Sequence, residues 1–387
     1  MSRLIFNLEA LQHNLSIIDG WMEKHGAYWT LVTKVLCGNE KALSILNNME
    51  VKSVGDSRFQ NLEIIHKIMP ETERWYLRPP SRSRINTIAK LCDVSLNSEI
   101  ETIKKLNDAA KAINKIHRIV IMIELGDLRE GILPGSLAKF YKDIFKLSNI
   151  EVIGIGANIG CLYGTIPTID QFMQLMLYRE LLELKFDRKL PLISAGSSAA
   201  LPLVLDKSLP KAINHFRIGE SVFLGTDLIN GGQLKGLHDD VVILEAEITE
   251  IKEKSLMPTG ETSNATMPFD VETNTDFQPG QRGYRALVEV GELDTDVSGL
   301  TPVEKNYSIA GASSDLTVVH VGDTMNDLKI SDTIKFKLGY SALLRLMSNI
   351  YVEKVFQGEK GLDMSGEDHY ADEFLPEIKT KHTTQDK

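Results

Sequence analysis

A lysine interrupts an apolar, β-prone segment near the start of the chain. The segment WTLVTKVLCGN, Trp29 to Asn39, changes at Lys34 from strand-forming residues to cysteine, glycine and asparagine. An unpaired ammonium loses more hydration in a protein interior than its stem regains by packing. Lys34 therefore either extends its ammonium into solvent at a strand end or serves as a reactive amine. Which interpretation holds depends on the residues elsewhere in the chain that accompany Lys34.

Other polar and small residues also stand where apolar runs end. The segments are ELGDLREG, GANIGC, SAGSSAA and RIGE. SAGSSAA could do no more than permit tight packing, and Arg129 could be only an ion-pair partner of Asp127 or Glu130. The candidate residues in these segments are Glu124, Asp127, Arg129, Glu130, Asn158, Gly196, Ser197, Ser198, Arg217, Gly219 and Glu220.

Short β-rich runs alternate with helix-length segments over the first 220 or so residues. Leucine, isoleucine and methionine at near-helical spacing predict a helix over 8–24, with Asn7 as its N-cap. This rhythm predicts a (β/α)8 TIM barrel, with a doubly wound open sheet as the alternative. The predicted strands are 27–32, 51–54, 74–78, 93–96, 118–125, 151–156, 190–194 and 215–218.

The rhythm changes after residue 238, where strand-like runs follow one another without helical spacers. We therefore expect a barrel over 7–238 and a smaller C-terminal β domain over 239–356, which the N-terminal strand 1–6 joins. The polar loop 252–282 is rich in turn residues, and a polar, mobile tail is expected over 357–387.

Barrel enzymes carry their active sites at the carboxyl ends of the strands, so the candidate residues should share one rim. The turns after the seventh and eighth strands are the usual phosphate cradle of this fold. A lysine amine, a phosphate cradle and an arginine on one rim indicate pyridoxal phosphate, with Lys34 forming a Schiff base.

Composition excludes several other classes of protein. The formal net charge is -10 and no Lys/Arg block dominates, which argues against a nucleic-acid partner. No signal peptide and no membrane-spanning run is recognised, and the 3 cysteines form neither a disulfide framework nor a zinc motif. We expect a cytoplasmic protein without a bound metal.

Seven sequence motifs, which occur in the same order over roughly residues 3–356, resemble those of the alanine racemase-type (fold type III) pyridoxal-phosphate enzymes. They are VTKVLCGN, ELGDLREGILP, GANIGCLYGTIPT, SAGSSAALPLV, INHFRIGESVFLGTD, GASSDL and LGYSALLRLMSNIYV. The chain is most similar to the ornithine or broad-specificity amino-acid racemase branch. This resemblance implies a head-to-tail homodimer in which the partner's β domain completes each site.

The resemblance also implies residue roles. Lys34 matches the Schiff-base lysine, and Arg217 matches the arginine that faces the pyridine nitrogen. Arg129 matches an arginine near the phenolic oxygen, and Asn158 stands where alanine racemases usually carry a histidine stacked on the ring. The phosphate-binding positions are Ser197 or Ser198, Gly219, Glu220 and Tyr340, and Asp315 matches an aspartate that approaches the partner's site.

The permanent positive charge of Arg217 fits a position beside the pyridine nitrogen. A guanidinium stays charged at any ordinary pH, so beside the pyridine nitrogen it prevents protonation of the ring. The ring is then a weaker electron sink, which suits proton removal and return at Cα better than reactions that need a long-lived carbanion.

Two departures leave the second acid/base open. VEVGELDTDVSGL lacks the tyrosine that alanine racemases use, and Leu316 follows the SSD triplet where the ornithine-type branch often has histidine. The candidates are Asp315, Ser313, Tyr307, Asp294 and Tyr284.

The expected function is two-base racemisation of a free amino acid, either alanine or a basic one. The acidic cluster Glu292, Asp294 and Asp296 could hold the cationic end of ornithine or lysine, or it could be a solvated turn. The alternatives are a pyridoxal-phosphate-binding protein without racemase activity, a metal-assisted D-amino-acid aldolase or dehydratase, and a decarboxylase. For the metal-assisted alternative, His320 is the only histidine of the β domain before the tail.

Overall fold

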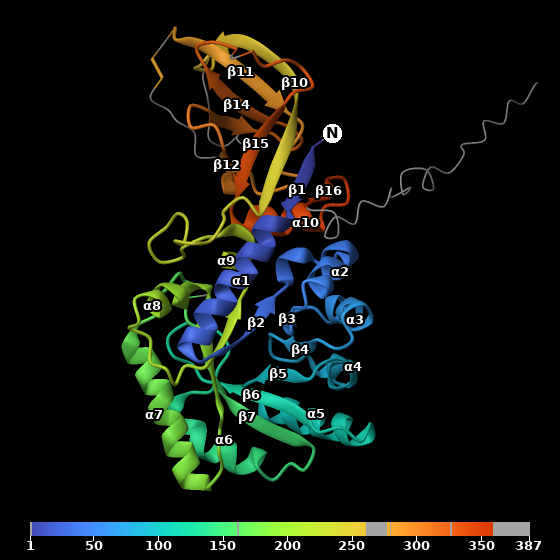
Figure 1. Ribbon diagram of the computed structural model, residues 1–387, viewed down its shortest axis with the longest axis vertical. Helices are drawn as coiled ribbons and strands as arrows, with labels where there is room; N and C mark the ends of the chain where they lie inside the picture. Colours follow the sequence, from blue (N-terminus) through green and yellow to red (C-terminus); the bar gives the residue numbers. More distant parts are fainter. Residues whose placement is uncertain (1, 161, 261–276, 279, 326, 359–387) are drawn as a thin grey trace, which may run out of the picture.

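The computed structural model describes residues 2–160, 162–260, 277–278, 280–325 and 327–358. Most of the predicted loop 252–282 and nearly all of the predicted tail 357–387 lie outside the described residues. The described chain forms a closed barrel of parallel strands and a separate eight-stranded sheet (Figure 1). The predicted fold class, a (β/α)8 barrel followed by a smaller β domain, is therefore confirmed.

The barrel contains all eight strands that the sequence predicted. Every neighbouring pair is parallel, and the barrel closes where β2 pairs with β9, with Leu31 opposite Ile218. The strands are β2 (Tyr28–Val32), β3 (Ser53–Asp56), β4 (Glu73–Tyr76), β5 (Val94–Asn97), β6 (His117–Met122), β7 (Ile150–Gly156), β8 (Leu192–Ser197) and β9 (His215–Ile218).

Helix α1 (Leu8–His25) begins and ends with recognisable caps. The Asn7 side chain accepts a hydrogen bond from the Ala10 N–H, and Gly26 ends the helix at φ 79°. The other helices around the barrel are α2 (Glu40–Asn48), α3 (Phe59–Ile68), α4 (Ile85–Leu91), α5 (Ile100–Ala112), α6 (Leu137–Ile144), α7 (Ile169–Phe186), α8 (Leu201–Leu205) and α9 (Glu220–Leu224), with 3-10 turns η1 (Lys34–Leu36), η2 (Arg82–Arg84), η3 (Pro134–Ser136) and η4 (Ser198–Ala200). No helix within the described residues is long and apolar enough to cross a bilayer.

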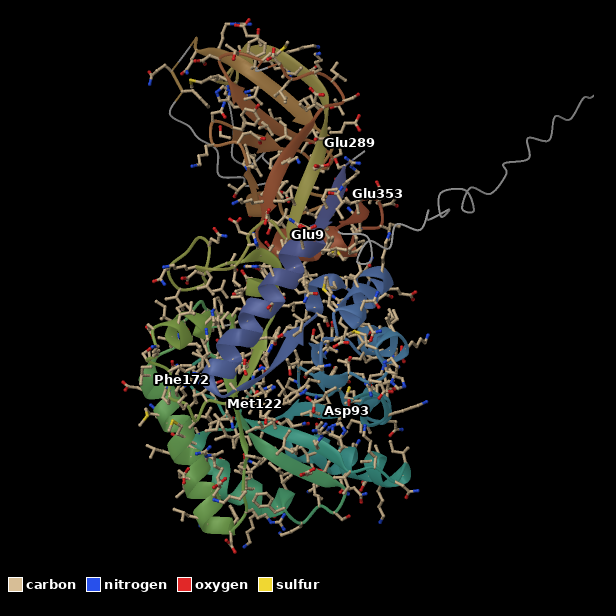
Figure 2. All side chains as sticks on the ribbon, viewed as in Figure 1. Glu9, Asp93, Met122, Phe172, Glu289 and Glu353 are labelled. Atoms are coloured by element: carbon tan, nitrogen blue, oxygen red, sulfur yellow. The ribbon has the colours of Figure 1, made fainter. Side chains whose placement is uncertain are left out.

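The second domain is built on one sheet with the order β12-β15-β10-β11-β14-β13. Strand β1 (Arg3–Asn7) joins it by pairing with β10 and with β16 (Glu353–Gln357), and then continues directly into α1 of the barrel. Figure 2 shows Glu289 and Glu353 in this domain, and Met122 and Phe172 in the barrel. The remaining strands are β10 (Val242–Ser255), β11 (Arg282–Val288), β12 (Leu300–Pro302), β13 (Ser308–Ala312), β14 (Thr317–Gly322) and β15 (Thr333–Leu338), with a 3-10 turn η6 (Val297–Gly299).

The sequence analysis missed one helix of this domain. Helix α10 (Tyr340–Ser348) buries Leu343 and Leu346 completely and packs against η1 of the barrel. At this contact the Cys37 thiol lies 3.7 Å from the Leu344 carbonyl oxygen. The turn that begins with Lys34 is therefore held by both domains.

Candidate functional site

Closure of the barrel brings Lys34 and Arg217 to neighbouring strands. Thr30 is opposite Arg217 in the β2–β9 ladder, and Lys34 begins the turn η1 that follows β2. The Lys34 side chain is half-buried, whereas Arg217 is 8% exposed. Both residues thus lie at the seam where the barrel closes, Arg217 on its last strand and Lys34 in the turn that follows its first strand.

Asp56, at the end of β3, is a charged residue that the sequence analysis missed. It is 1% exposed and accepts hydrogen bonds from the Arg58 N–H at 2.8 Å, from Asn61 Nδ2 and from Thr33 Oγ1. Burial raises the pKa of its carboxyl, while these hydrogen bonds and then the Lys34 charge act in the opposite direction. The available signal was an aspartate just after the predicted strand 51–54.

The Arg217 guanidinium donates hydrogen bonds to four neutral oxygen atoms. It donates to the carbonyl oxygens of Ser194 and Ala157, to the Ser194 hydroxyl, and to Asn158 Oδ1 at 2.9 Å. These acceptors fix the plane of the guanidinium without neutralising its charge. A group held beside Arg217 would therefore meet a buried positive charge of fixed orientation.

Asn158 connects Arg217 to Arg129. Its amide nitrogen donates to Glu130 Oε1 at 2.6 Å, and Glu130 forms an ion pair with Arg129. The alternative of an ion-pair partner therefore describes part of what Arg129 does, since the same pair also links it to the buried network. Glu130 was a candidate by position alone, and its bridging contact was not foreseen.

The turns after β8 and β9 lie side by side. Ser197 is opposite Arg217 in the ladder, and the Ser198 hydroxyl accepts from the Ser221 N–H at 3.4 Å. Gly219 has no room for a side chain, because a Cβ would lie 2.9 Å from both the Val32 Cβ and the Val32 carbonyl oxygen. Burial raises the pKa of the Glu220 carboxyl, which accepts from the Thr226 hydroxyl.

This donor set fits pyridoxal phosphate. Hydroxyl and backbone N–H donors on two adjacent turns suit a phosphate monoester, and a half-buried amine suits an aldehyde. The buried guanidinium between them suits a heteroaromatic nitrogen that accepts a hydrogen bond.

The predicted site residues of the second domain divide into two groups. Tyr340 opens α10, the helix that packs on the Lys34 turn. Asp294 accepts from the Gly291 N–H at 3.1 Å and from Asn349 Nδ2 at 2.9 Å. Asp315 is exposed and accepts from the hydroxyls of two serines, Ser313 and Ser314, both at 3.1 Å.

The turns that carry Asp294 and Asp315 belong to one surface of the β domain. The Leu293 N–H donates to the Ser314 carbonyl oxygen at 2.7 Å, which joins the two turns. The two turns that carry these carboxylates are thus adjacent, on a domain separate from the barrel rim. Their approach to a partner's site stays a prediction.

A large cavity lies at the other mouth of the barrel. It has a volume of about 980 Å³ and is lined by residues at the amino ends of the strands, among them Ser53, Glu73, Arg118 and His215. Because barrel enzymes carry their active sites at the carboxyl ends of the strands, the Lys34 rim, rather than this cavity, is the candidate active site. Within the described residues, no group of three or more His, Cys, Asp or Glu side chains could hold a metal ion.

Comparison with known proteins agrees with this geometry. The family model for the alanine racemase N-terminal domain matches residues 6–227. An ornithine racemase of Acetoanaerobium sticklandii is 36% identical over 355 residues, which cover 91% of this chain and 98% of that protein. A lysine racemase of Thermotoga maritima is 32% identical over 355 residues, covering 92% of this chain and 98% of that protein.

Solved structures share the fold at low sequence identity. The alanine racemase of Corynebacterium glutamicum superimposes with a TM-score of 0.68 at 15% identity, covering 92% of this chain and 99% of that one. An alanine racemase of Bartonella henselae with covalently bound pyridoxal phosphate gives a TM-score of 0.67 at 14% identity, with coverage of 92% and 99%. A D-threonine aldolase of Filomicrobium marinum gives 0.66 at 13% identity, with coverage of 92% and 91%.

Proposed function

The chain belongs to the alanine racemase family and is an amino-acid racemase, and we propose that it uses pyridoxal phosphate bound at Lys34 to racemise ornithine or lysine. One observation carries the assignment of the site. Barrel closure sets the half-buried Lys34, in the turn after β2, next to the strand that carries the buried Arg217, and the turns after β8 and β9 offer hydroxyl and N–H donors.

When bound, pyridoxal phosphate supplies an electron-withdrawing ring that makes the Cα proton of an amino acid acidic. Lys34 Nζ would hold the cofactor, and the same amine would move a proton at the substrate Cα on one face. Arg217 keeps the pyridine nitrogen unprotonated. The residues that would hold the phosphate are Ser197, Ser198, Gly219, Glu220 and Tyr340. Arg129 would hold the phenolic oxygen, and Asn158 would lie at the ring.

We propose Asp315 as the second acid/base, supplied by the partner in a homodimer. Exposed apolar side chains support such a dimer. Leu128 and Tyr163, on the loops after β6 and β7, are 71% and 69% exposed, and Leu293, on the β-domain turn, is 78% exposed. Burying these side chains against a second copy would remove apolar area from water on both surfaces that a shared site needs.

The substrate proposal rests on the two curated relatives and on Asp294. A basic side chain in a closed site needs a carboxylate, because a buried unpaired ammonium costs several kcal/mol. Asp294 carries a carboxylate on the turn that joins the one holding Asp315. In a shared site, the same surface of the partner would then supply both the second acid/base, Asp315, and the carboxylate that pairs with the substrate ammonium, Asp294.

The test follows hydrogen exchange at Cα in D2O by NMR, with purified protein, pyridoxal phosphate and a panel of amino acids. Exchange and racemisation of ornithine or lysine, well above alanine, would support the proposal. Binding of the cofactor without exchange at any amino acid would leave a cofactor-binding protein instead.

Borohydride reduction tests the position of the cofactor. Reduction should fix the cofactor to a single peptide that contains Lys34, while Lys41, seven residues on and outside the rim, serves as an internal control. Label on any other lysine would show that the site assignment is wrong.

A further inference from the structure

A chain of hydrogen bonds runs through the barrel interior from Arg217 toward the opposite mouth. Arg217 donates to the Ser194 hydroxyl, which contacts His215 Nδ1 at 2.8 Å. The other ring nitrogen, His215 Nε2, contacts Thr30 Oγ1 at 3.1 Å. Thr30 Oγ1 is in turn 2.8 Å from Ser53 Oγ, which donates to Glu73 Oε2 at 3.2 Å. We call these six side chains the relay.

The relay crosses the seam at which the barrel closes. Its members come from β9, β8, β2, β3 and β4, and Ser53 and Glu73 are direct partners in the β3–β4 ladder. Ser194, His215 and Thr30 are buried, and Trp75 stacks on the His215 ring at 4.3 Å between centroids. With little solvent around Ser194 and Thr30, these two hydroxyls bond mainly within the relay, whereas Ser53 and Glu73 line the cavity at the amino ends of the strands.

The two ends of the relay differ in hydrogen-bonding capacity. A guanidinium can only donate, and the Glu73 carboxylate, which also pairs with Arg118 at 2.9 Å and accepts from Trp75 Nε1 at 2.6 Å, can only accept. Since Ser53 gives its hydrogen to Glu73, it must accept from Thr30. Thr30 must then accept from His215 Nε2–H, and His215 Nδ1 must accept from Ser194.

We infer that Glu73 and His215 are positioning residues for Arg217, because the carboxylate orients every hydroxyl of the relay and holds His215 as the Nε2–H tautomer. The lone pair of Ser194 Oγ then faces the guanidinium. With the opposite tautomer, Ser194 Oγ would accept from both His215 and Arg217, and its own hydrogen would lose its acceptor in the relay. The Thr30 and Ser53 hydroxyls would turn round, and Ser53 would face Glu73 with a lone pair. Glu73 thus acts on the active-site rim from the far mouth of the barrel.

The charge state of His215 is consistent with this role. Burial and then the neighbouring Arg217 lower the pKa of the imidazole to about 3, so the ring is neutral under ordinary conditions. A neutral imidazole can accept at one nitrogen while it donates at the other, as the relay requires.

The tautomer can be measured without any catalytic activity. In full-length protein labelled with ¹⁵N-histidine, with and without pyridoxal phosphate, His215 should show a protonated Nε2 and an unprotonated Nδ1. The signal is assigned by its loss in His215→Gln. A protonated Nδ1 in the wild-type protein would overturn the inference.

The contribution of Glu73 is tested by cutting the relay at Ser53. Ser53→Ala should populate the Nδ1–H tautomer, and Ser53→Thr, which keeps a hydroxyl, should restore the wild-type spectrum. Arg118→Gln leaves the carboxylate acceptor in place and should not change the tautomer. An unchanged, fully Nε2-protonated ring in Ser53→Ala would show that Glu73 does not set the direction.

The functional consequence rests on the proposed racemase mechanism. Because Arg217 faces the cofactor rather than the substrate, Ser53→Ala should lower kcat about fivefold with little change in KM, as expected for one weakened hydrogen bond. His117→Gln is the matched control, since this second buried barrel histidine bonds Ser95 instead of the relay. Equal losses of kcat in both variants would overturn the positioning role. If the tautomer is as inferred but no amino acid is racemised, the proposed function fails and the relay stands.

Discussion

At the scale of single residues, the candidate site contains two buried charged side chains, Arg217 and Asp56, which are held by different kinds of hydrogen-bond partner. Arg217 donates to neutral oxygens, whereas the Asp56 carboxylate is held by several donors beside the Lys34 turn. A buried charge can be tolerated when hydrogen bonds replace its lost hydration. The barrel rim therefore presents a fixed cation and, beside the turn that carries Lys34, a fixed carboxylate.

The charge of Asp294 is predicted to determine substrate preference. Asp294→Asn keeps the shape of the side chain but removes the charge that would pair with a terminal ammonium. We expect KM for ornithine to rise about tenfold or more, since a hydrogen bond to a charged group contributes about 1.5–3 kcal/mol, while any turnover of alanine stays the same. Steady-state kinetics on both substrates measures this. Equal losses for ornithine and alanine would mean that Asp294 supports the turn through Gly291 and Asn349 instead.

At the scale of elements, turns and helix ends carry the site, and packing holds them in place. The Lys34 turn lies between the barrel and α10, and the end of β9 passes closely against β2 at Gly219. Close packing of this kind leaves no room for even one added carbon. The position of the rim therefore depends on small residues at the barrel seam.

Gly219→Ala should disturb this seam. The new Cβ would lie 2.9 Å from Val32 atoms of both backbone and side chain, so β9 or β2 must shift. Overpacking of this kind costs about 1–3 kcal/mol of unfolding free energy, and we expect cofactor affinity to fall with it. Gly20→Ala is the control, because nothing lies within 4 Å of its added Cβ in α1 and alanine favours a helix by about 0.5–1 kcal/mol. In thermal unfolding, Gly219→Ala should lower the stability and Gly20→Ala should raise it. In cofactor titration, only Gly219→Ala should lower the affinity.

At the scale of the whole molecule, the two domains are joined through β1. This strand lies in the second sheet between β10 and β16, and it leads without a break into α1 of the barrel. The chain thus carries its candidate residues on two domains: one set on the barrel rim and the other on the turns of the β domain. We propose that a second copy brings the two sets together.

Mixing two inactive variants tests the shared site. In a hybrid dimer of Lys34→Ala and Asp315→Ala protomers, one site keeps both groups and the other loses both. Random exchange of subunits should restore about a quarter of wild-type activity, because half the dimers are hybrids with one intact site. Hybrid formation is verified by mass. Verified hybrids without activity would contradict the role of Asp315.

Acid should destabilise the fold through two buried histidines. Burial lowers the pKa values of His117 and His215 to about 3, from an ordinary value of 6.5. Below pH 6.5 the unfolded chain takes up protons that the native protein does not, so the free energy of unfolding falls as the pH falls from 6.5 toward 3. The slope is up to about 1.4 kcal/mol per pH unit for each histidine. Denaturant titrations at several pH values should show a shallower fall for His117→Gln, whereas the exposed His66→Gln should keep the wild-type slope. Identical slopes for all three proteins would contradict this account.

The sequence by itself determined the barrel strands, the N-cap of the first helix and the motifs. Strand runs such as 27–32 and 215–218, and the Asn7 cap, depend on local periodicity and on side chains within a few residues, so the structure reproduces them. The position of Lys34 and Arg217 on one rim also followed, because parallel strands of a barrel end at the same face.

Only the tertiary structure decided which of these side chains touch. The relay joins His215 to Thr30 and Ser53 because β9 closes onto β2, and the register of that seam is a property of the closed barrel rather than of either strand. Asp56 acquires its perturbed environment by burial beside the Lys34 turn, and α10 reaches that turn from the other domain. Contacts between segments far apart in the chain form only when the whole barrel and sheet have packed, so no local pattern could specify them.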